Sequence, residues 1–326
     1  MDYTDVYFKG LSHVFHVSSI LAQFDLFGHT FTIRWYGAII AFGFLLAALL
    51  GGRIAYTWKM SLDKMVDVLI YGTLAGVVCA RLYYCFFEWD YYGQHPAEII
   101  KIWNGGLAIY GGIIGGVLAA FITSRVRKLN FLNLLDCVGI SLLVGQGIGR
   151  WGNFANQEAF GVNTDLPWGM WSEKTMAYIR SHQFEFAAEG ITVRAGSLTD
   201  KAYVHPTFLY ESLWCMLGVL VLYILCRKLR KFSGQMFLAY GVWYGVERAF
   251  VEGLRTDSLY IGAFRVSQLV SVALAAICLV LLIVFWIRAV RHPKPIDGID
   301  FYSDPTAGMK KKKTKHKTEV NHETES

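Results

Sequence analysis

Long apolar stretches, separated by shorter polar segments, run through most of the chain. Crossing the hydrocarbon core of a bilayer takes about 20 predominantly apolar residues in helical form, so each stretch of roughly that length is a predicted span. The predicted spans are residues 33–52, 66–87, 105–122, 131–149, 207–226, 235–251 and 261–290. The pattern therefore predicts an all-α fold, a polytopic membrane helix bundle of about seven transmembrane helices.

The segments outside these spans divide the rest of the chain. Residues 1–30 mix aromatic and polar positions and show no cleavable signal peptide, so we expect an interfacial N-terminal segment. Residues 151–204 form one long loop, and long loops usually carry structure or function. We expect this loop to be a small extracytoplasmic head inserted into a membrane domain of residues 31–290. Residues 291–326, with the run Lys310–Lys313, indicate a disordered basic cytoplasmic tail.

Lysine and arginine alternate between the connecting segments in a way that predicts orientation. Cytoplasmic loops of membrane proteins are enriched in these residues. The basic segments follow the first, third, fifth and seventh predicted spans, at residues 53–64, 125–128, 227–231 and from 291 onward. We therefore expect a multi-pass protein with its N-terminus outside and its C-terminus in the cytoplasm.

Composition narrows the class of protein further. The chain is 54% hydrophobic and 17% charged, whereas soluble domains carry roughly 25% charged residues. The six cysteines lie in or beside apolar spans without a CxxC pair, so we expect buried thiols and neither a metal site nor a disulfide framework. Much of the positive charge gathers in the tail, where no folded surface presents it. This argues against nucleic-acid binding and favours loose contact with anionic membrane lipid.

Polar side chains inside the predicted spans gather near the outer membrane surface, with Asp136 as the one clear exception. A charge within a bilayer costs about 2.5–3.5 kcal/mol, so these residues should face one another, a cavity or a charged ligand. Tyr244, Arg248 and Glu252 recur every four residues along one helical face, and Arg255 follows. Arginines outnumber carboxylates in the whole set, so we expect uncompensated positive charge that binds an anion. Salt bridges that only hold the helices together are the alternative.

A glycine-rich segment at the end of the fourth predicted span, GRWGNFANQEAFG at residues 149–161, is the second candidate site. Such a backbone is unsuited to a helix interior and suits a re-entrant turn that lines a polar cavity. Arg150 offers a planar fork for phosphate, while Asn153 and Asn156 offer amides for phosphate or glycerol oxygens. Glu158 would accept a proton or orient an arginine. A plain helix-ending loop with capping amides is the alternative.

Closely spaced glycines also mark the third predicted span, in the run GGLAIYGGIIGG at residues 105–116. Glycine lets helix backbones approach closely, so the run predicts tight helix–helix contact through small residues. Close approach of a lipid headgroup is the alternative.

Five motifs, in this order along the chain, resemble the prolipoprotein diacylglyceryl transferase family. They are CARLYY at 79–84, NGGLAIYGG at 104–112, GRWGNFANQEAFG at 149–161, HPTFLYE at 205–211 and YGVERAFVEGLR at 244–255. The resemblance begins at Arg34–Gly37 and covers essentially the whole length. It implies an enzyme of the bacterial inner membrane that moves the diacylglyceryl group of phosphatidylglycerol onto the lipobox cysteine thiol of a prolipoprotein signal peptide and releases glycerol phosphate. No metal or dissociable cofactor is implied.

Residue chemistry and the resemblance together give a candidate site. The resemblance carries over Tyr36, Arg81, Arg150, Asn153, Glu158, Gly161, His205, Tyr244, Arg248 and Glu252. We predict catalytic roles for Arg150, Glu158, Arg248, Glu252 and Tyr110. We predict substrate binding by Tyr36, Arg81, Asn153, Asn156, Gly161, His205, Tyr244 and Arg255.

The predicted chemistry leaves the proton acceptor open. Arginines, mainly Arg150 and Arg248, would stabilise the departing phosphate. Glu158 or Glu252, through Tyr110 or water, would take the thiol proton. Some family members place a histidine, proposed as the base, where this chain has Tyr110, whose ordinary pKa of about 10 makes it a poor base at neutral pH. An essential histidine base at that position is therefore in doubt.

Two other classes of protein remain as alternatives. A transporter of an anionic solute also needs arginines within a bundle, but it predicts a polar route that crosses to the inner side. A purely structural membrane scaffold predicts that the arginines pair internally and tolerate hydrophobic replacement.

Overall fold

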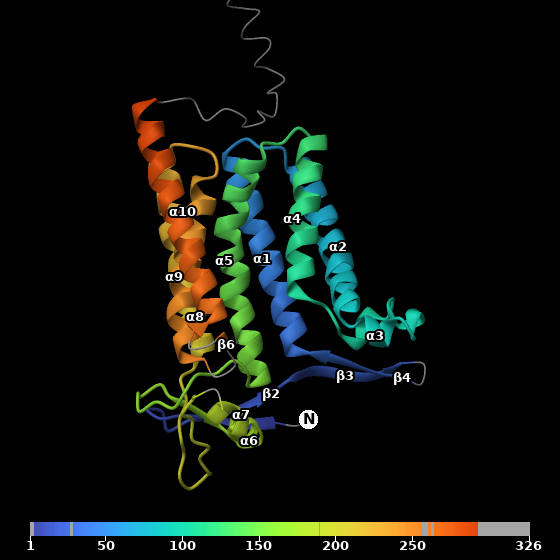
Figure 1. Ribbon diagram of the computed structural model, residues 1–326, viewed down its shortest axis with the longest axis vertical. Helices are drawn as coiled ribbons and strands as arrows, with labels where there is room; N and C mark the ends of the chain where they lie inside the picture. Colours follow the sequence, from blue (N-terminus) through green and yellow to red (C-terminus); the bar gives the residue numbers. More distant parts are fainter. Residues whose placement is uncertain (1–2, 27–28, 189, 256–259, 262–263, 293–326) are drawn as a thin grey trace, which may run out of the picture. The chain divides into compact units, whose positions relative to one another are not determined.

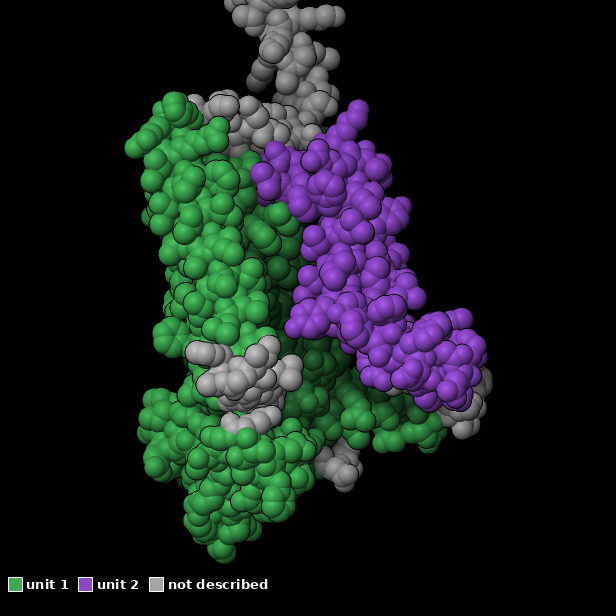
Figure 2. All heavy atoms as spheres, in the orientation of Figure 1, with its two compact units in different colours: residues 1–51, 135–294 green, residues 52–134, 295–326 purple. Residues whose placement is uncertain are grey.

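The computed structural model describes residues 3–26, 29–188, 190–255, 260–261 and 264–292 (Figure 1). The chain forms two compact units (Figure 2). Of the described residues, the first unit contains those within 3–51 and 135–292, and the second contains residues 52–134. The predicted basic tail lies outside the described residues from position 293 onward.

Among the residues that the structure describes, six helices are long and apolar enough to cross a membrane. They are α1 (Trp35–Thr57), α2 (Leu62–Phe87), α4 (Ile109–Val126), α5 (Phe131–Asn156), α8 (Thr207–Leu229) and α10 (Val266–Arg291). The sixth predicted span, residues 235–251, is also a helix, α9 (Gln235–Leu254), but Glu247, Arg248 and Glu252 make it more polar than those six. The prediction of a polytopic helix bundle is confirmed, and α9 is the helix that carries the predicted stripe.

The first unit combines membrane helices with a small head that contains a sheet. The head strands are β1 (Tyr3–Phe8), β2 (Val14–Ser18) and β5 (Met170–Ser172), in the order β2-β1-β5 and all antiparallel. Two short helices, α6 (Glu173–Ser181) and α7 (Gln183–Ala188), follow β5 (Figure 1). The head therefore draws on the first residues of the chain as well as on the long loop.

The head has a hydrophobic core of its own. Val6 of β1 packs with Met170 and Trp171 of β5 and with Met176 and Ile179 of α6, and each is at most 2% exposed. Burial of such side chains contributes about 1.5–3 kcal/mol each. The period of two in β1 and the turn-by-turn spacing in α6 bring these apolar positions to one side. The core fixes the loop that leads out of α5.

A second hairpin connects the head to α1. Its strands are β3 (Ile20–Leu26) and β4 (His29–Arg34), and β4 runs directly into α1. The pairs Ala22–Ile33 and Phe24–Phe31 face one side of this two-stranded sheet, because cross-strand partners share a face. The Phe24 and Phe31 rings stack with centroids 5.8 Å apart, and each side chain is 47% exposed. One face of the hairpin is thus apolar and open.

Asp136, the predicted exception on α5, caps the first turn of α9. Its carboxylate accepts hydrogen bonds from the amides of Gly234 at 2.9 Å, Met236 at 2.8 Å and Phe237 at 3.0 Å. Arg230 Nη2 donates to the same carboxylate at 2.9 Å, and the Asp136 side chain is 0% exposed. The first amides of a helix lack partners within it, so this buried pair completes α9 at the end of α5 away from the glycine-rich segment.

The second unit is built on the contact between α2 and α4. An added Cβ at Gly111 would lie 2.4 Å from Cys79 O, and one at Gly115 would lie 2.4 Å from Cys79 Cβ. Gly76 likewise faces Gly112, with its added Cβ 3.3 Å from Gly112 O. These distances leave no room for side chains, so the predicted helix contact through small residues is confirmed. The short helix α3 (Trp89–Tyr92) lies between α2 and α4 in the sequence.

Candidate functional site

Three arginines converge on Glu211, near the start of α8 (Thr207–Leu229). Arg150, near the end of α5, forms an ion pair with Glu211. Arg248 Nη1 of α9 lies 3.9 Å from Glu211 Oε1, and Arg255 Nη1, just beyond α9, lies 3.8 Å from the same oxygen. On α9 itself, Arg248 Nη2 lies 2.7 Å from Glu252 Oε2. We call these five residues the arginine–glutamate cluster, and all belong to the first unit.

The cluster retains unused hydrogen-bonding capacity. Glu211 and Glu252 are each 2% exposed, whereas the side chains of Arg150, Arg248 and Arg255 are 21%, 19% and 12% exposed. Among the described residues, Arg248 Nη1, Glu211 Oε1 and Glu252 Oε2 are buried without a hydrogen-bond partner. Buried polar groups are nearly always hydrogen-bonded in folded proteins. The open donor on Arg248 therefore indicates a ligand that supplies an acceptor.

Sequence reasoning expected more arginines than carboxylates at this depth, and the structure corrects that expectation. Glu211 and Glu247 lie inside the motifs HPTFLYE and YGVERAFVEGLR, but neither is among the predicted site residues. Glu247 is 4% exposed, and its carboxylate accepts from the Cys215 thiol at 3.6 and 3.7 Å. The position of Glu211 could have predicted its ion pairs, because a carboxylate within two turns of the end of a membrane span needs a cationic partner.

Residues 149–156 of the glycine-rich segment continue α5 to Asn156, so the predicted re-entrant turn is wrong for this part of the segment. The segment leaves α5 only from Gln157 onward, through a constrained turn. Gln157 and Ala159 both have φ of 55°, a left-handed conformation that is uncommon outside glycine. The turn is held by Thr207 Oγ1, which donates to Ala159 O, and by the Glu158 amide, which donates to Asn153 O at 3.0 Å. The strained residues flank Glu158 on both sides and so fix the direction of its side chain.

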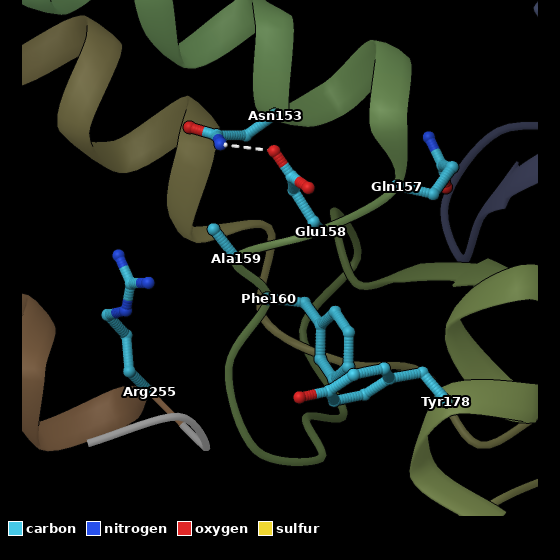
Figure 3. Close-up of a pocket in the computed structure, with 7 residues that line it drawn as sticks. All are labelled: Asn153, Gln157, Glu158, Ala159, Phe160, Tyr178 and Arg255. Atoms are coloured by element: carbon cyan, nitrogen blue, oxygen red, sulfur yellow. Dashed lines mark hydrogen bonds between the residues drawn. The ribbon is translucent and has the colours of Figure 1, made fainter. Parts of the chain in front are cut away.

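The Glu158 carboxylate and its neighbours line a cavity of about 370 Å³. Asn153 Nδ2 and Asn156 Nδ2 donate to Glu158 Oε1 at 2.9 and 3.3 Å. Figure 3 shows Glu158 pointing toward Asn153, with Arg255 at another side of the cavity. Because Arg255 also belongs to the arginine–glutamate cluster, the cavity and the cluster share one guanidinium.

The floor of this cavity is aromatic. Phe160 and Tyr178 both line it, and their rings meet edge to face with centroids 5.7 Å apart (Figure 3). The cationic side chain of Arg255 and an apolar wall therefore line the same cavity, as expected for a site that takes an amphipathic molecule.

Gly161 ties the end of the glycine-rich segment to α9. Its amide donates to His205 O at 2.9 Å, and it forms an isolated antiparallel bridge with Arg255. An added Cβ would lie 2.8 Å from Leu254 O and 2.9 Å from His205 Cβ. These contacts make Gly161 a positioning residue for Arg255, and its predicted substrate contact stays a prediction.

Two tyrosines with predicted binding roles border the same region. Tyr36, at the start of α1, packs its ring on Gly152, where an added Cβ would lie 2.9 Å from Tyr36 Cδ2. Tyr244 lies one turn before Arg248 on α9 and stacks on Tyr240 with centroids 5.9 Å apart. Both tyrosines thus lie beside residues of the site, and their substrate contacts stay predictions.

His205 belongs to a short chain of side-chain hydrogen bonds in the head. Its Nδ1 lies 3.0 Å from Tyr210 Oη, and Trp168 Nε1 donates to the same hydroxyl at 2.8 Å. Partial burial lowers the pKa of His205 below its ordinary value. The ring is therefore neutral at pH 7, so it offers a hydrogen bond and no charge to a ligand.

Two predicted site residues belong to the second unit. Arg81 of α2 is 5% exposed and donates to the carbonyls of Glu98 at 2.6 Å, Ile99 at 2.8 Å, Gly105 at 2.7 Å and Gly106 at 2.9 Å. These bonds hold the segment between α3 and α4 and give Arg81 a structural role. Its predicted contact with substrate stays a prediction.

Tyr110, the other member of the second unit, lies in the first turn of α4 with a side chain that is 68% exposed. Its predicted part in proton transfer also stays a prediction. As for metals, no group of three or more His, Cys, Asp or Glu side chains in the described part of the chain is placed to hold an ion.

Comparison with known proteins supplies the family. The family model described as prolipoprotein diacylglyceryl transferase matches residues 23–284. The chain belongs to this family. It is 46% identical over 254 residues to the phosphatidylglycerol–prolipoprotein diacylglyceryl transferase of Listeria innocua, covering 77% of this chain and 85% of that protein.

Proteins of the same name from two other bacteria are also similar to this chain. The protein from Acaryochloris marina is 41% identical over 267 residues, covering 81% of this chain and 89% of the relative. The protein from Finegoldia magna is 43% identical over 251 residues, covering 77% of this chain and 90% of the relative. The arginine–glutamate cluster and the cavity lie inside the matched region.

Proposed function

We propose that this chain transfers a diacylglyceryl group from phosphatidylglycerol to the cysteine thiol of a prolipoprotein, and that the arginine–glutamate cluster binds the lipid phosphate. Its family and the names of its relatives support the reaction. The observation that carries the site assignment is Arg248 Nη1, a buried donor without a hydrogen-bond acceptor among the described residues. A phosphate oxygen supplies that acceptor with charge assistance.

The reaction forms one bond and breaks one. The acceptor sulfur attacks the glycerol carbon that carries the phosphate ester, a C–S bond forms and the C–O bond breaks. The electron pair of that bond leaves with glycerol phosphate, whose negative charge increases in the transition state. Arg150 and Arg248 are already oriented by Glu211 and Glu252, so they stabilise this charge without reorganising.

The same geometry favours Glu158 as the acceptor of the thiol proton. Glu252 is buried against Arg248. Glu158 is exposed at the cavity, and in the hydrogen bonds of the described residues its carboxylate contacts only side-chain amides. A carboxylate held by an arginine is a weaker base than one held by neutral amides. Glu252 then acts as the group that orients Arg248.

A direct assay tests both parts of the proposal. Purified protein is incubated with phosphatidylglycerol and a lipobox peptide, and the peptide mass is followed together with glycerol phosphate release. We expect a diacylglyceryl mass increase with equimolar glycerol phosphate. Glu158→Gln should remove the proton acceptor and lower kcat, while Glu173→Gln, an exposed glutamate on α6, should not. Wild-type activity with an unaffected Glu158→Gln variant would refute the base assignment alone.

Transport of an anionic solute is not supported by this structure. That function needs a polar route along the bundle, and the polar group expected away from the cluster, Asp136, is closed into a cap and ion pair with Arg230. Together with the family, this contact argues for a membrane transferase.

We further propose the orientation and the membrane contact of the first unit. The loop between α8 and α9 contains Arg230 and Lys231, which supports an orientation with that side in the cytoplasm and the head outside the cell. The apolar face of the β3–β4 hairpin, with Phe24 and Phe31, then lies on the outer leaflet next to α1. A thiol probe at Phe24→Cys should be quenched by spin-labelled lipid more than one at Gln23→Cys on the opposite face; equal quenching would refute this placement.

A further inference from the structure

Glu247 is a buried carboxyl beside the arginine–glutamate cluster that the proposed reaction does not use. It is 4% exposed, and its recorded hydrogen bond comes from the Cys215 thiol, with Sγ 3.6 and 3.7 Å from its two oxygens. Among the described residues, no lysine or arginine nitrogen lies within 4.0 Å of it. Glu211 and Glu252, by contrast, each have an arginine partner.

The surroundings of Glu247 come from three helices, α5, α8 and α9 itself. The charged and titratable groups around it are Arg150 of α5, Glu211 and Cys215 of α8, and Tyr240, Tyr244 and Arg248 of α9 itself. Helix α10 packs on a different face of α9, at Gly241 and Gly245, where its nearest atoms belong to Ser271, Ala275 and Cys278. The charges that act on Glu247 are therefore those of the cluster.

A charge count shows why this carboxyl matters. Arg150, Arg248 and Arg255 supply three positive charges, and arginine does not lose its proton in proteins. Glu211, Glu252, Glu247 and Glu158, which lines the cavity together with Arg255, supply four negative charges when ionised, so these seven groups carry no excess positive charge for an added anion. A phospholipid phosphodiester adds one more negative charge in a largely dehydrated place, where an uncompensated charge is strongly unfavourable.

We propose that Glu247 takes up one proton when the anionic phospholipid binds, so that the occupied site contains one phosphodiester, three guanidiniums and the three carboxylates of Glu211, Glu252 and Glu158. This inference rests on the proposed function. Glu247 is the member suited to this role because it has no arginine partner, and its protonated form keeps a carbonyl oxygen for the Cys215 thiol. The bound proton stays on Glu247 during transfer, while the acceptor thiol gives its own proton to Glu158. The proton on Glu247 is released when glycerol phosphate leaves. Glu247 is thus a positioning residue that sets the charge of the site.

The test compares the pH dependence of KM for phosphatidylglycerol in wild type, Glu247→Gln and Glu247→Asp. Glutamine keeps the shape and the hydrogen-bond acceptor but is always neutral. Where Glu247 is ionised in the free wild-type protein, KM should rise with pH by up to about tenfold per pH unit, because binding then requires proton uptake. KM of Glu247→Gln should stay flat over that range with kcat within about twofold of wild type at low pH. Glu247→Asp should keep the rise.

Measuring all three proteins side by side separates the titration of Glu247 from other effects of pH on KM. Titration of the acceptor thiol and of the vesicle surface is the same for all three proteins, so only the difference between them reports Glu247. Identical KM profiles in wild type and Glu247→Gln would overturn the inference while leaving the proposed function intact. Absence of any transfer by wild type at every pH would instead overturn the proposed function.

A second measurement needs no variant. Binding of a short-chain phosphatidylglycerol to wild-type protein is measured by calorimetry at one pH in two buffers with different ionisation enthalpies. At a pH where the wild-type KM is rising, the difference in heat should correspond to uptake of one proton per lipid bound. Uptake of no proton at that pH would overturn the inference, even if Glu247→Gln failed to fold.

Discussion

Replacing Arg248 with lysine keeps a positive charge on α9 but removes the forked guanidinium. In the native protein one arm of that fork, Nη2, lies 2.7 Å from Glu252, and the other, Nη1, is buried without an acceptor. A lysine ammonium near Glu252 would preserve the first contact and lose the second. Arg248→Lys therefore isolates the donor that we assign to the lipid phosphate.

The expected size of the effect follows from that single donor. A hydrogen bond to a charged group contributes about 1.5–3 kcal/mol, which corresponds to a decrease of about 10- to 150-fold in kcat/KM. Arg248→Ala is a poorer test, because it also leaves Glu252, which is 2% exposed, without its closest cation. Such a buried, unpaired charge destabilises the whole protein and obscures the chemical effect.

The assay is transfer from phosphatidylglycerol to a lipobox peptide, with thermal unfolding of each variant measured beside it. Arg288→Lys provides the matched control, because Arg288 is an exposed arginine in the last turn of α10. We expect the control to match wild type. If Arg248→Lys folds normally and retains kcat/KM within threefold of wild type, Nη1 does not bind the phosphate and the site assignment is wrong.

Three further predictions concern positions around the site. Asp136→Ala should lower the free energy of unfolding by about 3–5 kcal/mol, because it leaves buried Arg230 without its carboxylate partner. Adding Arg230→Met to that variant should recover part of the lost stability, measured by chemical unfolding. Gly161→Ala should lower transfer activity and cost about 1–3 kcal/mol, because its Cβ would lie 2.8 Å from Leu254 O; an unchanged melting temperature and rate would contradict this. The pKa of His205 is lowered by burial, so the unfolded chain binds a proton more readily, and the melting temperature should fall as pH drops below about 6.5. His205→Gln should reduce that fall, and an identical pH profile would count against it.

The sequence predicted the helices, and it singled out several residues that the structure brings together in the arginine–glutamate cluster, because both follow from strong local signals. Spans are long apolar stretches, and the recurrence of Arg248 and Glu252 on α9 follows from helical spacing alone. The glycines of α4 also predicted its contact with α2. In each case the relevant information lies within one segment of the chain.

Features that depend on pairing between segments were harder to predict. Glu211 is the point where three arginines meet, yet nothing near it in the sequence shows which helices face α8. The sheet of the head pairs β1 with β5, strands more than 150 residues apart. Arg81 was grouped with the substrate-binding arginines by residue type, whereas its contacts are four backbone carbonyls. Residue type predicts which groups a side chain offers, but only the fold determines which partner those groups contact.

The polarity of α9 has a consequence for how the protein is made. Glu247, Arg248 and Glu252 each oppose partition of a lone helix into lipid by about 2.5–3.5 kcal/mol. Their partners Arg150 and Glu211 belong to α5 and α8, which leave the ribosome earlier, while α10 follows later and is the more apolar neighbour. During biosynthesis α9 should therefore wait at the translocon until α8 and α10 are available to enter the bilayer with it. A nascent chain that stops before α10 should leave α9 unintegrated and exposed to quality-control proteases.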